Sequence, residues 1–150
     1  MLRDELQNSL KEAMKARDTQ TVNAVRLIIA GQKEKDVEAR GKGLEKASDA
    51  DLLAMMQSMI KQRNESIKIY IDGNRADLAE KEKGEIEVIS RFLPKQMSTE
   101  EVEKAIRAVI SETGAAGIRD MGKVMGSLKT KYAGQMDFAA ASALIKQILS

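Results

Sequence analysis

The sequence contains no cysteine and no histidine. Without cysteine the chain can form no disulfide, offers no thiolate nucleophile and cannot build a zinc knuckle. Without histidine it lacks the usual general base near neutral pH and the commonest metal ligand in proteins. It also lacks a glycine loop of the kind that cradles nucleotide phosphates. We therefore expect no catalytic residues, no metal and no cofactor.

Aromatic residues and proline are also scarce. Aromatics make up 3% of the 150 residues and proline occurs once, whereas hydrophobic residues reach 43%. The core must therefore consist of Leu, Ile, Val, Ala and the nine Met residues, which suits the packing of helices better than the packing of sheets. A chain with one proline and ten glycines is neither linker-like nor disordered.

No apolar run is long enough to span a membrane. The longest extends from Ala24 to Ala30 and is interrupted by Arg26. The early acidic residues Asp4 and Glu5 speak against a secretory signal and against a transit peptide. We therefore expect a soluble, cytoplasmic protein with no membrane partner.

The net charge is small and unevenly distributed. The formal value is +2, although charged residues make up 32% of the chain. Residues 1–93 carry seventeen basic and seventeen acidic side chains, and residues 94–150 carry eight basic and six acidic ones. Since there is no polybasic tail, an anionic partner would have to be bound by a local patch.

Apolar residues recur with a helical period along nearly the whole chain, and no segment alternates like a strand. We therefore predict an all-α fold. Before Pro94 the pattern predicts four helices that form a bundle of two helical hairpins. The first carries Leu2 to Met14, the second begins at Asp18 or Thr19 and ends near Gly41, the third follows Ser48 and stops at Asp72, and the fourth runs to about Phe92.

Pro94 marks a boundary between two lobes, because its ring disfavours helical geometry in the residue before it. We predict an N-terminal helical lobe over residues 1–93 and a small C-terminal lobe of three helices over residues 98–150. Ser98 and Glu101 have the spacing of a capping box at the start of the second lobe. Its helices are expected at roughly 99–113, from a cap at Asp120 to Gly134, and from a cap at Asp137 onward.

Two carboxylates are the only candidates for acid–base or metal chemistry. Glu82 and Glu85 lie three residues apart on one helical face, and paired carboxylates can do such work. They can also pair with Arg63 or Arg26 across a hairpin. We favour this structural interpretation, because a catalytic site usually needs groups that converge from several elements.

The most informative segment runs from residue 119 to residue 132. On a helical wheel its apolar side chains gather in one arc, and the opposite arc holds basic and hydroxyl side chains, among them Thr130. Gly122 and Gly126 lie one turn apart, away from the apolar arc. The candidate RNA-binding residues, here called the basic strip, are Arg119, Gly122, Lys123, Gly126, Ser127, Lys129 and Lys131.

The two glycines of the basic strip need an explanation, because each glycine inside a helix costs about 1 kcal/mol relative to alanine. Their pairing on one exposed strip suggests that another molecule or element approaches the backbone closely. The basic side chains around them favour a phosphate-binding face. A solvated helix face, with glycines that let a neighbouring helix pack, agrees with the same pattern equally well.

The run Asp120-Met121-Gly122-Lys123-Val124-Met125, with Lys131, Gly134 and Asp137 beyond it, resembles the C-terminal signature of the GatB/YqeY-like family. The resemblance spans essentially the whole chain. Other family-like pieces are Arg26-Leu27, residues 61–66, Tyr70, residues 77–79, Glu82 with Glu85, and residues 92–94.

The resemblance implies a function. The family includes the tail of the B subunit of the glutamine-dependent aspartyl/glutamyl-tRNA amidotransferase, as well as short proteins that consist of the tail alone. In the amidotransferase the tail grips the outer corner of the tRNA, and kinase and amidase domains absent from this chain do the chemistry. The matching positions for RNA binding are Gly122, Lys123 and Gly126. Gln135 departs from the pattern, since the family commonly has a basic residue there.

The first hypothesis is therefore a non-catalytic module that binds tRNA or another folded RNA, together with a protein partner in tRNA amidation or translation. Single-strand readers stack bases on exposed aromatics, and Tyr132 and Phe138 are expected in the core, so a folded RNA fits better. The alternative is a helical adaptor that binds another protein and has no RNA role. A third hypothesis, a self-contained amidotransferase or carbon–nitrogen ligase, is considered only because family members often carry such names.

Overall fold

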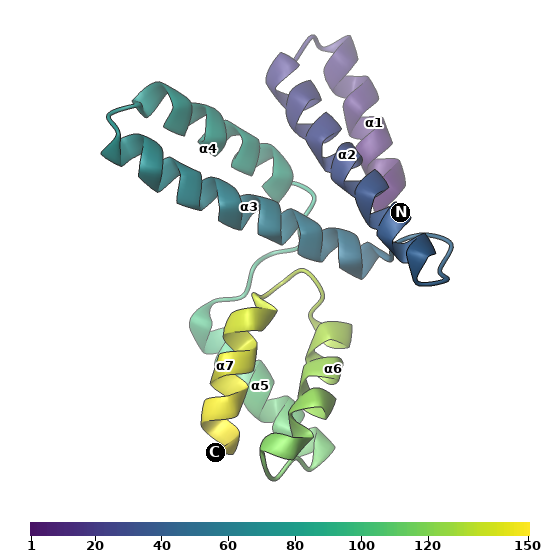
Figure 1. Ribbon diagram of the computed structural model, residues 1–150, viewed down its shortest axis with the longest axis vertical. Helices are drawn as coiled ribbons and strands as arrows, with labels where there is room; N and C mark the ends of the chain where they lie inside the picture. Colours follow the sequence, from purple (N-terminus) through teal and green to yellow (C-terminus); the bar gives the residue numbers. More distant parts are fainter. The chain divides into compact units, whose positions relative to one another are not determined.

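The computed structural model describes residues 1–150, which form seven α-helices and one short 3-10 helix and no strand (Figure 1). The predicted all-α fold is confirmed. Contacts between Cα atoms divide the chain into two units, Met1–Pro94 and Lys95–Ser150, each with a hydrophobic core of its own. We call them the N-terminal unit and the C-terminal unit.

The N-terminal unit consists of two antiparallel helical hairpins (Figure 1). Their cores meet because each helix carries an apolar face, and the side chains that are completely buried between them are Leu6, Val25, Ile28, Leu52 and Met56. The first hairpin contains α1 (Leu2–Lys15) and α2 (Thr19–Gly41), and the second contains α3 (Asp49–Asp72) and α4 (Ala76–Ser90).

Side-chain caps start the two long helices. Asp18, and not Thr19, caps α2: its carboxylate accepts from the backbone N of Thr21 at 3.2 Å and from the Thr21 hydroxyl at 2.6 Å. These bonds hold the pKa of Asp18 below its usual value. Ser48 and Asp51 form a complete capping box at the start of α3. Both caps satisfy backbone N–H groups that a helix start otherwise leaves without partners.

The fourth helix is shorter than predicted. It ends at Ser90, and the backbone N–H groups of Arg91, Phe92 and Leu93 each bond to the carbonyl three residues earlier. The chain therefore tightens into a turn before Pro94, because proline disfavours helical geometry in the preceding residue.

A buried ionic cluster ties α1, α2 and the following loop together. Asp36 is 8% exposed, and it accepts hydrogen bonds from both terminal nitrogens of Arg3 at 2.8 and 2.7 Å. It also accepts from the backbone N of Ala47 at 2.9 Å, while the Ala47 carbonyl accepts from Arg3 at 2.8 Å. The Arg3 guanidinium and this amide hold the pKa of Asp36 well below its usual range.

The C-terminal unit is a three-helix lobe made of α5 (Thr99–Thr113), the 3-10 helix η1 (Ile118–Asp120), α6 (Met121–Lys131) and α7 (Phe138–Leu149). The side chains completely buried at its centre are Ile106, Val124, Leu128 and Ile145. The segment that leads into α5 is fixed to the loop between α6 and α7, since Met97 N donates to the Gln135 carbonyl at 2.9 Å.

The helix ends of this unit agree in part with those predicted from the sequence. Ser98 Oγ accepts from Glu101 N at 3.2 Å, so one of the two reciprocal bonds of the predicted capping box is present. Gly114 ends α5 with a φ of 67°, the left-handed conformation that glycine adopts most easily. Asp137 caps α7 as predicted. The end of α6, at Lys131, precedes the predicted end at Gly134.

Candidate nucleic-acid interface

The inner face of α6 packs into the core of the C-terminal unit. Val124 and Leu128 are completely buried, and Met121, Met125 and Tyr132 are partly buried against the same cluster. This is the apolar arc that the helical wheel predicts. The orientation of α6 is therefore fixed by its core side chains, and the opposite face points to solvent.

The outer face of α6 and the preceding η1 carry the basic strip. Ser127 is half-buried and the other six residues of the strip are exposed. No acidic residue occurs within α6, Met121–Lys131. The fold thus gathers the predicted residues on one surface whose own helix contributes only positive charge.

The two glycines of the strip are open. A Cβ atom built on Gly122 or on Gly126 would meet no atom within 4 Å. Neither glycine adopts a left-handed φ, so backbone conformation does not require glycine there. Within the C-terminal unit no helix packs on these positions. The C-terminal unit therefore leaves the backbone of α6 uncovered at both positions, and no helix of this unit accounts for the glycines.

Two of the lysines lean toward the C-terminal end of α5. The ammonium of Lys123 donates to the carbonyl of Thr113 at 3.2 Å, and Lys131 forms an ion pair with Glu112. The hydrogen bond from Lys131 to Glu112, together with the negative charge of that carboxylate, raises the pKa of Lys131. Both contacts are exposed to solvent and therefore exchange readily for other anionic partners.

Arg119 and Lys129 form no hydrogen bond or ion pair within the chain. The hydroxyl of Thr130 donates to the Gly126 carbonyl at 3.0 Å, a bond internal to the helix, which occupies its donor. The Ser127 hydroxyl has no such partner. The strip thus offers two unpaired cations and one unpaired hydroxyl beside the open glycines.

Asp120 differs from its predicted role. Its side chain does not cap α6; its carboxylate accepts from the backbone N of Ala116 at 2.9 Å and of Gly117 at 3.4 Å. These backbone bonds, with the nearby charges of Arg119 and Lys123, lower the pKa of Asp120. The carboxylate closes the loop between α5 and α6 and so fixes the position of η1, which carries Arg119.

The carboxylate pair of α4 takes the structural role that we favoured. Glu85 accepts from Nε of Arg63 at 2.8 Å, and Glu82 lies 3.8 Å from the same nitrogen. Arg63 also donates to the Met59 carbonyl at 3.1 Å.

Nowhere in residues 1–150 are three His, Cys, Asp or Glu side chains grouped to hold a metal ion. No helix is long and apolar enough to cross a membrane.

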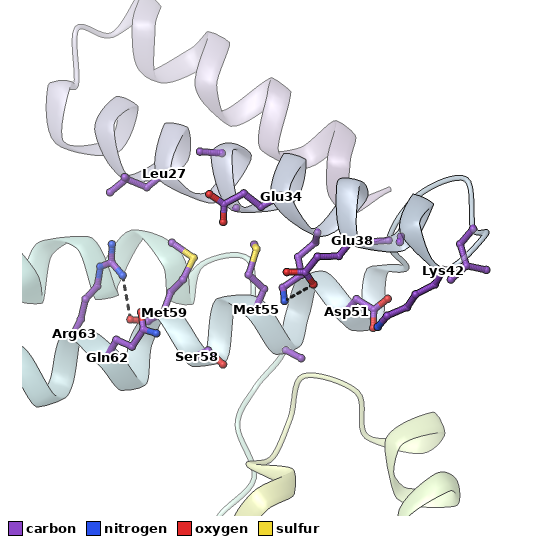
Figure 2. Close-up of a pocket in the computed structure, with 17 residues that line it drawn as sticks. Leu27, Glu34, Glu38, Lys42, Asp51, Met55, Ser58, Met59, Gln62 and Arg63 are labelled. Atoms are coloured by element: carbon purple, nitrogen blue, oxygen red, sulfur yellow. Dashed lines mark hydrogen bonds and ion pairs between the residues drawn. The ribbon is translucent and has the colours of Figure 1, made fainter.

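The N-terminal unit has a groove that the sequence analysis did not predict. It lies between α2 and α3, has a volume of about 780 Å3, and is lined by Leu27, Glu34, Met55, Met59 and other residues of the two helices (Figure 2). Leu27 is 44% exposed there. The one available signal was Leu27 itself, an apolar side chain beside the buried stripe of α2.

Comparisons with known proteins place the chain in a family. The family model described as Yqey-like protein matches residues 3–149. Among curated proteins, "Altered inheritance of mitochondria protein 41, mitochondrial" is 38% identical over 88 residues in Lachancea thermotolerans and 40% identical over 88 residues in Candida glabrata. The protein of the same name in Saccharomyces cerevisiae is 28% identical over 132 residues, which are 84% of this chain and 69% of the relative.

The first two alignments cover 59% of this chain and 46% and 47% of the relatives. The chain thus spans about half the length of these curated relatives. The names of these relatives refer to mitochondria and mention neither RNA nor a reaction.

Proposed function

The chain belongs to the YqeY-like protein family, and we propose that it is a non-catalytic module that binds a folded RNA through the outer face of α6. The observation that carries the proposal is the pair of open glycines, Gly122 and Gly126, on a helix face with basic and no acidic residues. Glycine in a helix interior costs about 1 kcal/mol, and nothing in the fold recovers this cost. A ligand that needs close access to the backbone would account for the two glycines.

A sugar–phosphate backbone matches this face. Arg119 and Lys129, which have no partner in the chain, flank the glycines and can each contact a phosphate. Lys123 and Lys131 can exchange the Thr113 carbonyl and the Glu112 carboxylate for phosphates. Such contacts fix position and do not read sequence, so the ligand is recognised by its shape.

The aromatic side chains support a folded RNA over a single strand. Tyr132 and Phe138 are partly buried against the core of the C-terminal unit and are not displayed beside the strip. Bases of a single strand would find no stacking platform there. The resemblance to the tail of the tRNA amidotransferase B subunit makes tRNA the first candidate, with a protein partner in tRNA amidation or translation.

The direct test is a titration with unmodified tRNA at several salt concentrations. Arg119→Ala and Lys129→Ala should each weaken binding and reduce the salt dependence by about one unit of slope per lost phosphate contact. Lys146→Ala, an exposed lysine on α7 of the same unit, is the matched control and should change neither.

Gly126→Leu provides the second arm. Because nothing lies within 4 Å of a Cβ at this position, leucine should fit without loss of stability, yet it should block the approach of RNA. Wild-type protein that binds no tRNA at low salt would reject the proposal and leave the adaptor hypothesis.

The compartment is a separate question for experiment. The three relatives are named as mitochondrial proteins, whereas the sequence led us to expect the cytoplasm for this chain. Cell fractionation followed by immunoblotting distinguishes the two, and either compartment contains tRNA.

A further inference from the structure

The groove between α2 and α3 is a second surface, in the N-terminal unit. Its floor includes a close contact between the helices, since a Cβ on Gly31 would meet the sulfur of Met55 at 2.7 Å. From this floor the two helices present opposing rows of side chains. Those from α2 include Leu27, Ala30, Glu34 and Glu38, and those from α3 include Asp51, Ala54, Ser58, Met59 and Gln62.

The two ends of the groove differ in chemistry. At one end Leu27 of α2 lies across from Met59 of α3 (Figure 2). Ala30, one turn from Leu27 on α2, is exposed. Methionine is a flexible and polarizable side chain that adapts to irregular apolar partners. This end therefore offers a seat for an apolar side chain.

Toward the other end the groove is lined by charged side chains of both signs, with the acids Glu34, Glu38 and Asp51 and the bases Lys35 and Lys42. Glu38 is paired with Lys35 at 3.1 Å, and Asp51 is engaged in the capping box of α3. Glu34 is exposed and forms no hydrogen bond or ion pair within the chain. Arg63, the cation at the apolar end, is neutralised by Glu85 and Glu82. The carboxylate of Glu34 thus remains unpaired at the middle of the groove.

We propose that this groove binds an amphipathic helix of a partner protein, with an apolar side chain seated between Leu27 and Met59 and a basic side chain paired with Glu34. Leu27 and Glu34 are two turns apart on α2, roughly 10 Å at 1.5 Å per residue. A partner helix that lies along α2 meets both when its apolar and basic side chains are also two turns apart. Helix-in-groove recognition commonly uses such spacing.

The charge of the groove argues for a protein over a nucleic acid here. Glu34, Glu38 and Asp51 line the same stretch and repel phosphates. Of the two lysines that also line it, Lys35 is held by Glu38, and Lys42 extends toward Asp51 (Figure 2). This surface is therefore chemically different from the basic strip on α6. The inference goes beyond the proposed RNA binding and does not depend on it.

The test uses two labelled, alanine-based helical peptides and fluorescence anisotropy. Both carry leucine at one position; seven residues on, one carries lysine and the other glutamate. The lysine peptide should bind the full-length wild-type chain, and Glu34→Lys should weaken this binding roughly two- to fivefold, as expected for an exposed ion pair. Glu34→Lys should in turn bind the glutamate peptide better than the wild type does, because the charges are then complementary again.

Two further variants complete the experiment. Leu27→Asp should reduce binding of either peptide roughly tenfold, because it removes the apolar seat. Glu65→Lys changes an exposed acid of α3 outside the groove and should leave binding unchanged. Unchanged circular dichroism spectra establish that each variant is folded, and unchanged tRNA affinity of Glu34→Lys separates this result from the test of the α6 face.

Three outcomes overturn the proposal. One is a wild-type chain that binds neither peptide, and another is equal binding of both peptides to the wild type and to Glu34→Lys. The third is a concentration-dependent dimer in sedimentation velocity that Leu27→Asp dissociates, because the groove would then be covered by a second copy of this chain.

Discussion

Gly31 of the N-terminal unit and Gly126 of the C-terminal unit both lie inside helices, yet their surroundings are opposite. A Cβ on Gly31 would meet Met55 at 2.7 Å, whereas a Cβ on Gly126 would meet nothing within 4 Å. The first glycine serves the fold, since it allows α2 and α3 to touch. The second makes no such contact within the C-terminal unit. The role of a glycine inside a helix can therefore be interpreted only when its surroundings are known.

Charged side chains differ between the units in the same way. In the N-terminal unit Arg3 and Asp36 are largely buried and fully hydrogen-bonded. In the C-terminal unit the ion pairs Lys131–Glu112 and Arg107–Glu103 are exposed. Removal of one partner of a buried ion pair strongly destabilises the folded state, whereas exposed pairs contribute little to stability. Mutation of the buried pair should therefore affect folding much more than mutation of either exposed pair.

The largest effect is expected from Asp36→Ala, which leaves the buried Arg3 without its partner. The midpoint of thermal unfolding, measured by circular dichroism, should fall by several degrees. Lys131→Ala is the matched change in the C-terminal unit and should leave the midpoint nearly unchanged. Equal shifts for the two variants would contradict the contrast between the units.

The same carboxylate predicts a pH dependence. The pKa of Asp36 is lower in the folded than in the unfolded chain, so its contribution is present above the unfolded value, about 3.9, and is lost progressively as the pH falls below it. Unfolding midpoints between pH 7 and pH 3 should decline more steeply for the wild type than for Asp36→Asn. Parallel curves would mean that Asp36 does not titrate with folding.

The next effect is on the glycines. Gly31→Leu should destabilise the chain by about 2 kcal/mol, because its side chain would displace the buried Met55. Gly126→Leu places the same side chain in open space and should not destabilise it. Chemical denaturation of the two variants measures the difference, and a similar loss for both would show that α6 is covered.

A smaller effect of opposite sign is expected on the outer face of α6. Gly122→Ala should stabilise the C-terminal unit by about 1 kcal/mol, because alanine is the better helix former and the added methyl group meets no atom. If the basic strip binds RNA, the same variant should gain stability and lose affinity. A gain in both quantities would remove the functional reason for this glycine.

The smallest change in stability is expected at two residues with a left-handed backbone conformation. Arg17 adopts a φ of 56° between α1 and α2, whereas Gly114 adopts 67° after α5. A residue with a Cβ pays for this conformation, so Arg17→Gly should stabilise by about 1 kcal/mol or less and Gly114→Ala should destabilise by about 1 kcal/mol. Denaturation curves of both variants test this, and a loss of stability for Arg17→Gly would show that its side chain matters more than its φ.

Local patterns predicted most of the fold. The helices, the hairpins, the caps Ser48 and Asp137, and the apolar arc of α6 depend on residues close in sequence, and these features are present. Local patterns were insufficient at two positions. Asp120 has the position of a helix cap, but its carboxylate bonds to the preceding loop. Ile71 continues the apolar stripe of α3 but is 55% exposed, because the tip of the α3–α4 hairpin is a layer of only two helices (Figure 1).

The candidate site divides in the same way. The helical wheel placed the basic strip on one face, because a helix fixes the relative directions of its own side chains. It could not reveal that Lys131 lies beside Glu112, or that the two glycines are uncovered, since both depend on α5 and on the packing of the lobe. The groove beside Leu27 arises from the angle between two hairpins, and no short segment of sequence encodes that angle.

The contact between Gly31 and Met55 also has a consequence for oxidative damage. With no cysteine in the chain, methionine supplies the only sulfur that oxidants can attack. Met59 is half-buried in the groove and is the more accessible of the two, whereas the Met55 sulfur lies only 2.7 Å from where a Cβ on Gly31 would stand. A sulfoxide oxygen at Met55 would add polarity and bulk at the close contact between α2 and α3. Peroxide would therefore loosen the joint between the hairpins, and methionine sulfoxide reductases could restore it.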